Sequence, residues 1–426
     1  MASGALGDAD QAIRLGMVAG ETSGDLLAAS VLEGLQHSSL SPESGVTGIA
    51  STVRLNAAGI GGPAMAARGF DAWWPSETLA VRGYVEVIRA YPKLRRIRHQ
   101  LFDRMQAWHP DVFVGVDAPD FNLDLERRLR ASGTRVAHFI GPSIWAWRGE
   151  RIRTIARSVD RMLLLFPFEK RLYDAAGIDA TYVGHPLADA IPLQTDSAAA
   201  RAALGIPQGR TLIAVLPGSR GSEITYIAPV FIQTIAWLAA QRSDLCFIVP
   251  AATPRLFDRL KALLAAAGLP DHTDCRLIMG RSHEARAAAD AVLVASGTAT
   301  LEVALHRKPM VIAYRMAWAT HRLMRNMGYL PWIGLPNILC HESLVPEFVQ
   351  DAATPQAMGS ALLAQLDDPA QLARLAERFA GMHEQLRCNC AHRAAQALLE
   401  MVPPERLRAA QIRERASASE PSQAPS

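Results

Sequence analysis

The stretch Leu212-Ile-Ala-Val-Leu-Pro-Gly-Ser-Arg-Gly-Ser-Glu223 joins an apolar strand to a turn of small residues, an arginine and the start of a helix. Backbone N–H groups of Gly218 and Ser219 can approach an anion closely, the positive end of the helix favours it, and Arg220 offers two parallel donors. This pattern predicts a diphosphate site. An ordinary strand–helix turn with a surface arginine explains the same residues, and both interpretations stay open. The spacing is not that of a P-loop, which disfavours hydrolysis through a Walker lysine.

Strand-like apolar runs alternate with helical patterns on both sides of this stretch. The runs cover residues 13–19, 111–116, 135–140 and 161–166, and then 212–216, 245–250, 291–295 and 309–314. Continuous apolar strands between amphipathic helices are typical of parallel sheets covered on both faces. One helical stripe recurs at spacings of three and four and predicts a face turned to a core: Ile224, Ile227, Phe231, Ile235 and Leu238.

The fold class that follows is α/β, with two doubly wound Rossmann-like domains facing a cleft. A length of 426 residues suits two domains. We expect a flexible N-terminal tail over 1–12, an α/β domain over 13–190 and a second over 191–380. A helix over 381–403 could pack back on the first domain, and a flexible tail covers 404–426. Ligands of such sheets bind beyond the carboxyl ends of the strands.

Composition excludes several classes of protein. Half of the residues are hydrophobic and 20% are charged, which is globular composition. A net charge of +3 does not indicate a nucleic-acid partner. The five cysteines are irregularly spaced and fit reduced thiols in a cytosolic protein, and no second cluster completes a zinc site beside Cys388 and Cys390. No signal peptide or membrane-spanning run is recognisable.

Two strand ends in the first half carry acidic side chains. Gly20-Glu-Thr-Ser-Gly-Asp25 opens a helix, where Glu21 and Ser23 are site candidates and helix capping is the rival explanation. Asp117 and Asp120 follow a buried strand and are well placed for a general base. We favour Asp117 because it is nearer the strand end, although a helix cap with an Asx turn accounts for the pair as well.

Three further sets of residues are less specific. Ser296, Gly297 and Thr298 follow another apolar strand and suit a phosphate, while Glu302, one turn further, could accept hydrogen bonds from ribose; a plain capped helix is the rival. His138, His185, Trp145, Trp147 and Arg148 are candidates for the cleft, although packing is the more usual role of such residues. The basic, amphipathic segment 81–104 could lie on anionic lipid or form a solvated helix face.

Six motifs together resemble the lipid-A-disaccharide synthase family over residues 13–401. They are Gly20-Glu-Thr-Ser-Gly-Asp25, Asp117-Ala-Pro-Asp-Phe-Asn122, Pro142-Ser-Ile-Trp-Ala-Trp-Arg148, Phe166-Pro-Phe-Glu169, Leu216-Pro-Gly-Ser-Arg-Gly221 and Ser296-Gly-Thr-Ala-Thr-Leu-Glu302. The resemblance implies a GT-B fold, with the lipid acceptor on the first domain and the nucleotide sugar on the second. It implies transfer from UDP-2,3-diacylglucosamine to 2,3-diacylglucosamine 1-phosphate, giving the β-1,6-linked disaccharide 1-phosphate and UDP.

The resemblance also assigns residues. Asp117 matches the proposed base, and Glu21, Arg220 and Glu302 match positions important for activity or nucleotide binding. We expect inversion in one step, no metal and no cofactor, and a place in the cytoplasm on the inner face of the bacterial inner membrane. The segment 81–87 departs from the family's usual start there. A UDP-sugar epimerase of the same fold and a non-catalytic nucleotide-sugar binding module remain the alternatives, and the oligomeric state is open.

Overall fold

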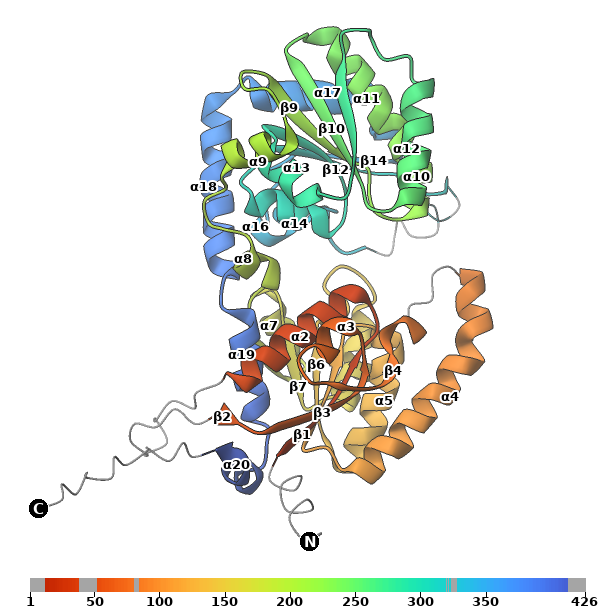
Figure 1. Cartoon of the computed structure of the whole chain (residues 1–426), viewed down its shortest axis with the longest axis vertical. Coiled ribbons are helices and arrows are strands. Elements are labelled where there is room, and N and C mark those ends of the chain that lie inside the picture. The colour runs from red at the N-terminus through yellow and green to blue at the C-terminus, as the bar shows by residue number, and fades with distance from the viewer. Residues whose placement is uncertain are drawn as a thin grey trace, which may run out of the picture. The chain divides into compact units, whose positions relative to one another are not determined.

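The computed structural model describes residues 12–37, 52–79, 84–318, 320, 322 and 328–412. The chain forms two compact units (Figure 1). Unit 1 comprises the chain up to Pro186 and from Cys388 onward, and unit 2 comprises Leu187–Arg387. The sequence places these divisions at 190/191 and 380/381. Both units have the α/β architecture that the alternating pattern predicts.

Unit 1 contains a seven-stranded parallel sheet in the order β4-β3-β1-β5-β6-β7-β8. Its strands are β1 (Ile13–Ala19), β3 (Leu55–Gly61), β4 (Asp71–Pro75), β5 (Val112–Val116), β6 (Arg135–Phe139), β7 (Arg161–Leu164) and β8 (Asp179–Tyr182). Every residue of β5 is buried, because helices cover both faces of the sheet. The strand order reverses between β1 and β5, so this is where ligands of such sheets bind.

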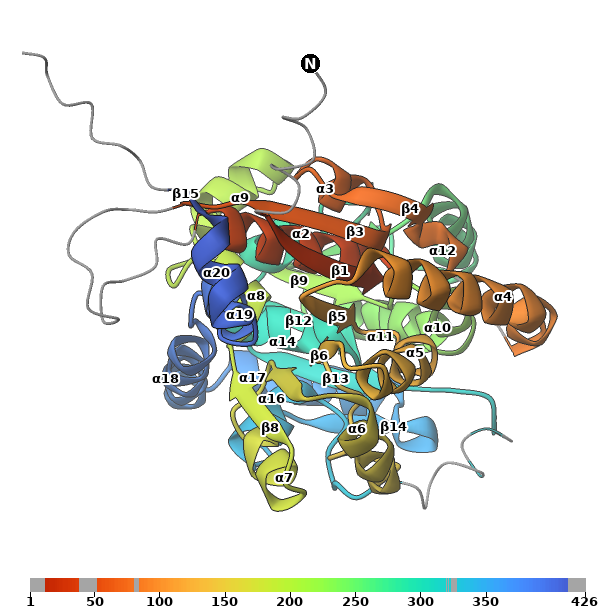
Figure 2. The same ribbon diagram turned by 90° about the horizontal axis from the view of Figure 1, so that it is seen from below.

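The helices of unit 1 form two layers (Figure 2). One layer packs around α2 and the other around α5. The helices are α2 (Thr22–Gln36), α3 (Pro63–Ala66), α4 (Tyr84–Trp108), α5 (Pro119–Ala131), α6 (Ile152–Ser158), α7 (Glu169–Ala175), α19 (Cys390–Leu399) and α20 (Pro404–Ala410), with short 3-10 turns η2 (Ser76–Thr78) and η3 (Gly149–Arg151).

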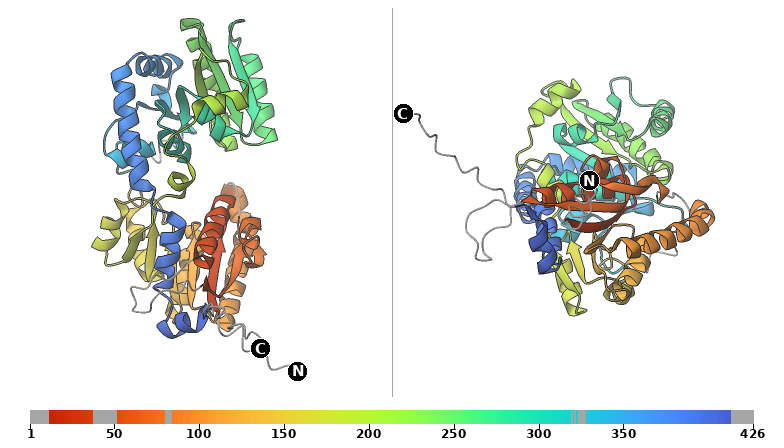
Figure 3. Two further views of the ribbon diagram at one scale, coloured as in Figure 1. Left: turned by 60° about the vertical axis from the view of Figure 1, so that its left-hand side comes forward. Right: turned by 60° about the horizontal axis from the view of Figure 1, so that its bottom comes forward.

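The C-terminal helix α19 packs against α2 within unit 1, as the views in Figure 3 also show. A Cβ added to Gly34 of α2 would lie 2.8 Å from the carbonyl oxygen of Ala391, so this approach needs a glycine. The prediction that a flexible tail begins at residue 404 is wrong for the described part. Residues 404–410 form α20, and β15 (Gln411–Ile412) pairs antiparallel with β2 (Thr52–Val53). Arg406 holds α20 in place by donating to the Asp111 carboxylate at 2.9 Å.

Unit 2 contains a six-stranded parallel sheet in the order β11-β10-β9-β12-β13-β14. Its strands are β9 (Thr211–Leu216), β10 (Leu245–Ala251), β11 (Asp274–Met279), β12 (Ala291–Ala295), β13 (Met310–Tyr314) and β14 (Glu347–Val349). The strand of the opening motif, β9, lies between β10 and β12. The order reverses at β9 and β12, which places the opening motif at the expected ligand-binding position.

Helices cover both faces of this sheet as well (Figure 1). They are α8 (Pro186–Ala190), α9 (Ser197–Leu204), α10 (Gly221–Tyr226), α11 (Ala228–Gln241), α12 (Pro254–Ala266), α13 (Ser282–Ala288), α14 (Thr298–Leu305), α16 (Leu335–Cys340), α17 (Pro355–Leu366) and α18 (Pro369–Leu386), with a 3-10 turn η4 (Gln350–Ala352). No helix in the described residues is both long and apolar enough to cross a membrane.

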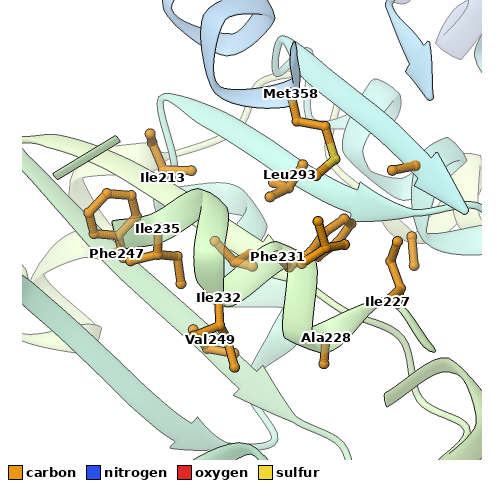
Figure 4. Close-up of a cluster of buried hydrophobic side chains, with 14 of the residues drawn as sticks. Ile213, Ile227, Ala228, Phe231, Ile232, Ile235, Phe247, Val249, Leu293 and Met358 are labelled. Atoms are coloured by element: carbon orange, nitrogen blue, oxygen red, sulfur yellow. The ribbon is translucent and has the colours of Figure 1, made fainter. Parts of the chain in front are cut away.

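The core of unit 2 confirms the predicted helical stripe. All five of its residues are fully buried. In Figure 4, Phe231 of α11 points toward Leu293 of β12 and Met358 of α17, while Ile235 lies beside Phe247. Burying a large apolar side chain contributes roughly 1.5–3 kcal/mol each, so this cluster fixes α11 and, through it, the turn that precedes α10.

Candidate functional site

A cavity of about 330 Å³ opens in unit 2 where β9, β10, β11 and β12 end. It is lined by residues from all four strand ends and from three helices: Leu216, Gly218, Ser219, Arg220, Glu223, Pro250, Ala251, Ala252, Gly280, Ser282, Arg286, Ala295, Ser296, Gly297, Thr298, Ala299 and Glu302. We call it the donor pocket, after the nucleotide sugar that the resemblance predicts for this domain. It brings together all seven candidates that the sequence placed in this half of the chain. The volume suits a small polar ligand.

The first turn of the donor pocket differs in one respect from the expected anion site. The N–H groups of Ser219 and Arg220 donate to the Glu223 carboxylate at 2.8 and 3.0 Å. The Ser219 amide, which the sequence offered to a phosphate, is therefore occupied by a side chain of the same loop. The Arg220 side chain is 79% exposed and its guanidinium lies 3.6 Å from Glu223, which leaves it able to meet a ligand.

Gly218 is the residue on which this turn depends. Its φ is +102°, and an added Cβ would lie 2.2 Å from the nearer oxygen of Glu223. Gly218→Ala is expected to weaken UDP binding about tenfold, since left-handed backbone costs about 1–2 kcal/mol for a residue with a Cβ and the collision adds to it. Gly221→Ala is the matched control, because its Cβ would meet nothing closer than 3.7 Å. Titration calorimetry with UDP measures both, and equal affinities would contradict the argument.

The second turn of the donor pocket starts α14. Gly297 has a φ of +149° and precedes the first helical residue, Thr298. The Ser296 hydroxyl donates to the carbonyl of Ile333 at 2.7 Å, so it serves the loop as well as lining the cavity. The carboxylate of Glu302 receives a hydrogen bond from Arg286 of α13. Arg286 is a lining residue that no sequence motif indicated.

In unit 1, Asp117 directly follows β5 and has an unusual backbone conformation. Asp117 and Ala118 have φ of +52° and +44°, two successive left-handed residues that are not glycine. Such conformations persist only where the surroundings hold them. The Asp117 N–H donates to Phe139 at 2.8 Å, and the Asn122 side chain donates to the Asp117 carbonyl at 2.7 Å. The helix cap is Ala118, without a side-chain bond, so Asp117 does not cap α5.

Glu21 and Ser23 lie at the neighbouring strand end, after β1. Both are exposed, and Glu21 is the residue before α2, but its side chain makes no capping hydrogen bond. A Cβ built on Gly20 would lie 3.4 Å from that of Ala118, so the two turns are in contact. The buried Asp25 accepts hydrogen bonds from the Gly62, Ala64 and Met65 amides at 2.8, 2.9 and 3.1 Å. Its role is to tie this turn to α3, which the sequence interpretation missed.

Of the remaining candidates of unit 1, Asp120 lies in the first turn of α5, and Trp147 and Arg148 follow β6. Asp120 is 87% exposed and pairs with Arg151. The Arg148 guanidinium stacks on Trp147, 4.3 Å from the ring centre. Such stacking gives Arg148 a fixed position beside the chain that follows β6. Trp147 is partly exposed and Arg148 is exposed, so both are accessible to a ligand.

His138 does not face a cleft, because it is fully buried. Its Nδ1 lies 2.6 Å from Oε1 of Glu126, which is also fully buried. Burial lowers the pKa of His138, but the charges of Glu126 and Asp117 raise it more, so the net shift is upward. The pair has no space for a neighbouring side chain, since a Cβ on Gly115 would lie 1.9 Å from Glu126. It forms a polar support beneath the strand end that carries Asp117.

The Phe166-Pro-Phe-Glu169 motif forms an aromatic cluster after β7. Glu169 accepts hydrogen bonds from the Trp145 ring at 3.1 Å and from the Phe166 amide at 3.0 Å. Phe166 and Phe168 stack at 5.8 Å, and Trp145 meets both edge-on. Burial raises the pKa of Glu169 to about 7. As pH falls, this carboxyl therefore takes up its proton at a higher pH than a glutamate with the ordinary pKa of 4.5.

The raised pKa of Glu169 makes stability depend on pH. The unfolded carboxyl, with a pKa of 4.5, loses its proton first, so stability falls as pH rises from 4.5 to 7. One pKa unit corresponds to about 1.4 kcal/mol, which gives a loss of roughly 3 kcal/mol. Glu169→Gln is expected to remove this slope. Urea unfolding of parent and variant at pH 4.5, 6 and 7.5 measures it, and a parallel pH dependence in the two proteins would contradict the assignment.

Solved structures identify the fold class of the chain. UDP-GlcNAc 2-epimerase from Neisseria meningitidis bound to UDP-GlcNAc superposes with a TM-score of 0.56 and 13% identity over 91% of this chain and 99% of that one. MurG from Acinetobacter baumannii superposes with a TM-score of 0.55 and 15% identity, over 92% of this chain and 99% of that one. Such low identity shows the fold alone. The fold is the two-domain α/β fold of GT-B glycosyltransferases.

Sequence comparison narrows the class to one family. Residues 15–399 match the family model for lipid-A-disaccharide synthetase. Lipid-A-disaccharide synthase from Azoarcus sp. (strain BH72) is 51% identical over 386 residues, covering 91% of this chain and 95% of that protein. The same enzyme from Aromatoleum aromaticum (strain DSM 19018 / LMG 30748 / EbN1) is 52% identical over 388 residues, covering 91% and 96%. The chain belongs to the lipid-A-disaccharide synthase family.

Proposed function

We propose that the protein transfers the 2,3-diacylglucosamine unit of UDP-2,3-diacylglucosamine to 2,3-diacylglucosamine 1-phosphate, releasing UDP and the β-1,6-linked disaccharide 1-phosphate of lipid A biosynthesis. Family membership over residues 15–399 is the observation that carries this proposal. The donor pocket supports it, because two strand–helix turns and Arg220 meet there as a diphosphate requires. The exposed acidic turns of unit 1 are left for the acceptor.

In the proposed mechanism, Asp117 accepts the proton of the acceptor 6-hydroxyl while that oxygen attacks the anomeric carbon from the face opposite UDP. One bond forms as the bond to the diphosphate breaks, so the anomeric centre inverts. Arg220 and the start of α14 stabilise the negative charge that develops on the leaving diphosphate. This charge stabilisation requires no metal. Glu21, whose turn contacts that of Asp117, binds or orients the acceptor.

The acyl chains of both substrates favour a protein that works at a lipid surface, and α4 is the segment we propose for this contact. Its apolar residues Ile97 and Leu101 are buried in the core of unit 1, so they are not available to lipid. Its outer face presents Tyr91, Arg95 and Arg96, all exposed. An anionic lipid surface attracts such arginine side chains electrostatically. Residues 80–83 and the side chains of 84–90 lie outside the described part of the structure.

We therefore propose a cytoplasmic protein that binds peripherally to the inner face of the bacterial inner membrane. Flotation with vesicles tests the contact. Binding to vesicles containing phosphatidylglycerol, lost in 1 M salt and absent with phosphatidylcholine alone, is the expected result. Equal binding to both kinds of vesicle would contradict an electrostatic contact through α4.

The decisive experiment measures UDP release by the purified protein from UDP-2,3-diacylglucosamine in detergent and EDTA, with and without 2,3-diacylglucosamine 1-phosphate. Release only in the presence of acceptor is expected for the metal-independent transferase. A UDP-sugar epimerase of the same fold would change the donor without needing the acceptor. Donor binding without release in either case would favour a non-catalytic nucleotide-sugar module.

A further inference from the structure

Arg286 is a charged residue of the donor pocket that lies outside every sequence motif. It is on α13 and lines the cavity together with Glu302 of α14. Its side chain is only 6% exposed. Burying a guanidinium is unfavourable unless an anion compensates it. A pocket built only to admit an anion would not need its second arginine to be buried, so the partner of Arg286 decides what it does.

That partner is Glu302. Arg286 Nη2 donates to Oε2 of Glu302, whose side chain is 20% exposed. Burial lowers the pKa of Arg286, and the charge of Glu302 opposes this shift. Within the described residues, no hydrogen bond reaches Oε1 of Glu302, and the buried Nε of Arg286 has no partner either. The ion pair thus uses one carboxylate oxygen and leaves the other able to accept.

The ion pair also reduces the repulsion between Glu302 and a bound diphosphate. A lone carboxylate close to Arg220 and the two strand–helix turns would repel an incoming diphosphate. Compensated by Arg286, Glu302 adds no net charge and still offers an acceptor. An acceptor held in one orientation loses less conformational freedom when a ligand hydroxyl binds. Two hydroxyls on neighbouring carbons, as in a ribose, are the donors that such an oxygen suits.

We propose that Arg286 is a positioning residue of the donor site, which holds the Glu302 carboxylate so that its free oxygen accepts hydrogen bonds from the ribose hydroxyls of the nucleotide. This inference rests on the proposed function, because it takes the occupant of the pocket to be a uridine diphosphate. It separates the tasks of the two arginines that line the pocket. Arg220 meets the diphosphate, and Arg286 gives the site its preference for a ribonucleotide.

The test compares the affinities of UDP, 2′-deoxy-UDP and 3′-deoxy-UDP by titration calorimetry, without acceptor or turnover. The parent protein is expected to prefer UDP to at least one deoxy analogue by about tenfold or more, the value of a hydrogen bond to a charged group. Arg286→Met, which keeps the length of the side chain and removes its charge, is expected to bring this ratio close to one. Glu302→Gln is expected to reduce the ratio as well.

Arg220→Met is the matched control, because it removes the same group from the same pocket. It is expected to weaken UDP and both deoxy analogues equally and to keep the ratio. If Arg286 instead bound the phosphates, Arg286→Met would behave like Arg220→Met, and the inference would be overturned. Arg286→Lys and the double variant Arg286→Met/Glu302→Gln cover a failure of Arg286→Met to fold. Arg286→Lys should keep part of the preference for UDP over the deoxy analogues. The double variant should show the same preference as Glu302→Gln. A preference equal to that of the parent in the double variant refutes the assignment.

The two proposals fail in distinguishable ways. A parent protein that does not bind UDP removes the proposed function and this inference together. A parent that binds UDP and shows acceptor-dependent release, but has the same UDP preference after Arg286→Met, refutes the positioning role alone. Thermal unfolding without ligand shows whether each variant is folded before its affinities are compared.

Discussion

Asp117→Asn is expected to lower kcat by about 10²–10⁴-fold and to leave the affinity for UDP unchanged. General base catalysis contributes an effect of that size, and an amide cannot take the proton of the acceptor hydroxyl. The fold should tolerate the change. Asparagine is among the residues that adopt left-handed backbone most readily, and the bond from Asn122 reaches the Asp117 carbonyl rather than its side chain. The proposed function places UDP in the donor pocket of unit 2, whereas Asp117 belongs to unit 1 and does not line that pocket.

Asp120→Asn is the matched control for this variant. It makes the same chemical change three residues further, on a carboxylate that is 87% exposed and paired with Arg151. Exposed ion pairs contribute about 0–1 kcal/mol to stability, so the variant should stay folded. Asp120 takes no proton in the proposed mechanism, so kcat should fall far less than in Asp117→Asn. Initial rates at saturating donor and acceptor, with UDP titrations beside them, measure both variants. An Asp117→Asn protein that turns over as fast as the Asp120→Asn protein is incompatible with Asp117 as the base.

The fold was predictable because its main signals are local. Runs such as Val112–Val116 are apolar without a break. A short run of this kind is typical of a strand that is covered on both faces. The stripe through Phe231 has a helical period, and the structure buries it completely. Chain ends were less predictable. The helix α20 is fixed by Arg406 reaching Asp111, a contact across 295 residues that no local pattern reveals.

The candidate site was predictable where it consists of strand ends. Parallel strands bring their carboxyl ends to one edge, so Gly218 and Glu302, 84 residues apart in the sequence, were expected together and line one cavity. Residues that act from the middle of a helix were missed. Glu126 and Arg286 carry no motif, since an acidic or basic residue within a helix is usually a solvated one. Their burial against His138 and Glu302 depends on packing between elements.

The amide of Ser219 shows a second limit of sequence interpretation. A small-residue turn before a helix predicts free N–H groups for an anion, yet Glu223 from the next turn already accepts from Ser219 and Arg220. A carboxylate at a helix start is favoured by the same partial charge that favours a phosphate. The sequence pattern therefore does not distinguish a helix start that binds a phosphate from one whose amides already donate to a carboxylate of the chain. The arginine side chain is therefore left as the principal new contact for a diphosphate at this turn.

Arg220→Met is expected to lower kcat/KM by about 10²–10³-fold, the usual cost of removing one donor from developing negative charge. The exposed guanidinium lies 3.6 Å from the Glu223 carboxylate, so its loss should not disturb the loop. Two hydrogen bonds from the Ser219 and Arg220 amides to the same carboxylate hold the loop and do not involve the arginine side chain. The loss of affinity should be confined to ligands that carry a diphosphate. UDP binding should weaken markedly, and uridine binding should not change, because uridine has no phosphate for Arg220 to meet.

Arg220→Lys separates charge from geometry in this prediction. A lysine keeps the positive charge but not the two parallel donors, so it should recover only part of the lost kcat/KM. Arg259→Met is the control for the loop, since Arg259 donates to the Gly221 carbonyl at 3.1 Å and does not line the cavity. Inhibition by UDP and by uridine, each competing with the donor substrate, is measured on all three variants and shows whether Arg220 binds the diphosphate. If Arg220→Met weakened uridine as much as UDP, the arginine would shape the whole pocket rather than bind the diphosphate.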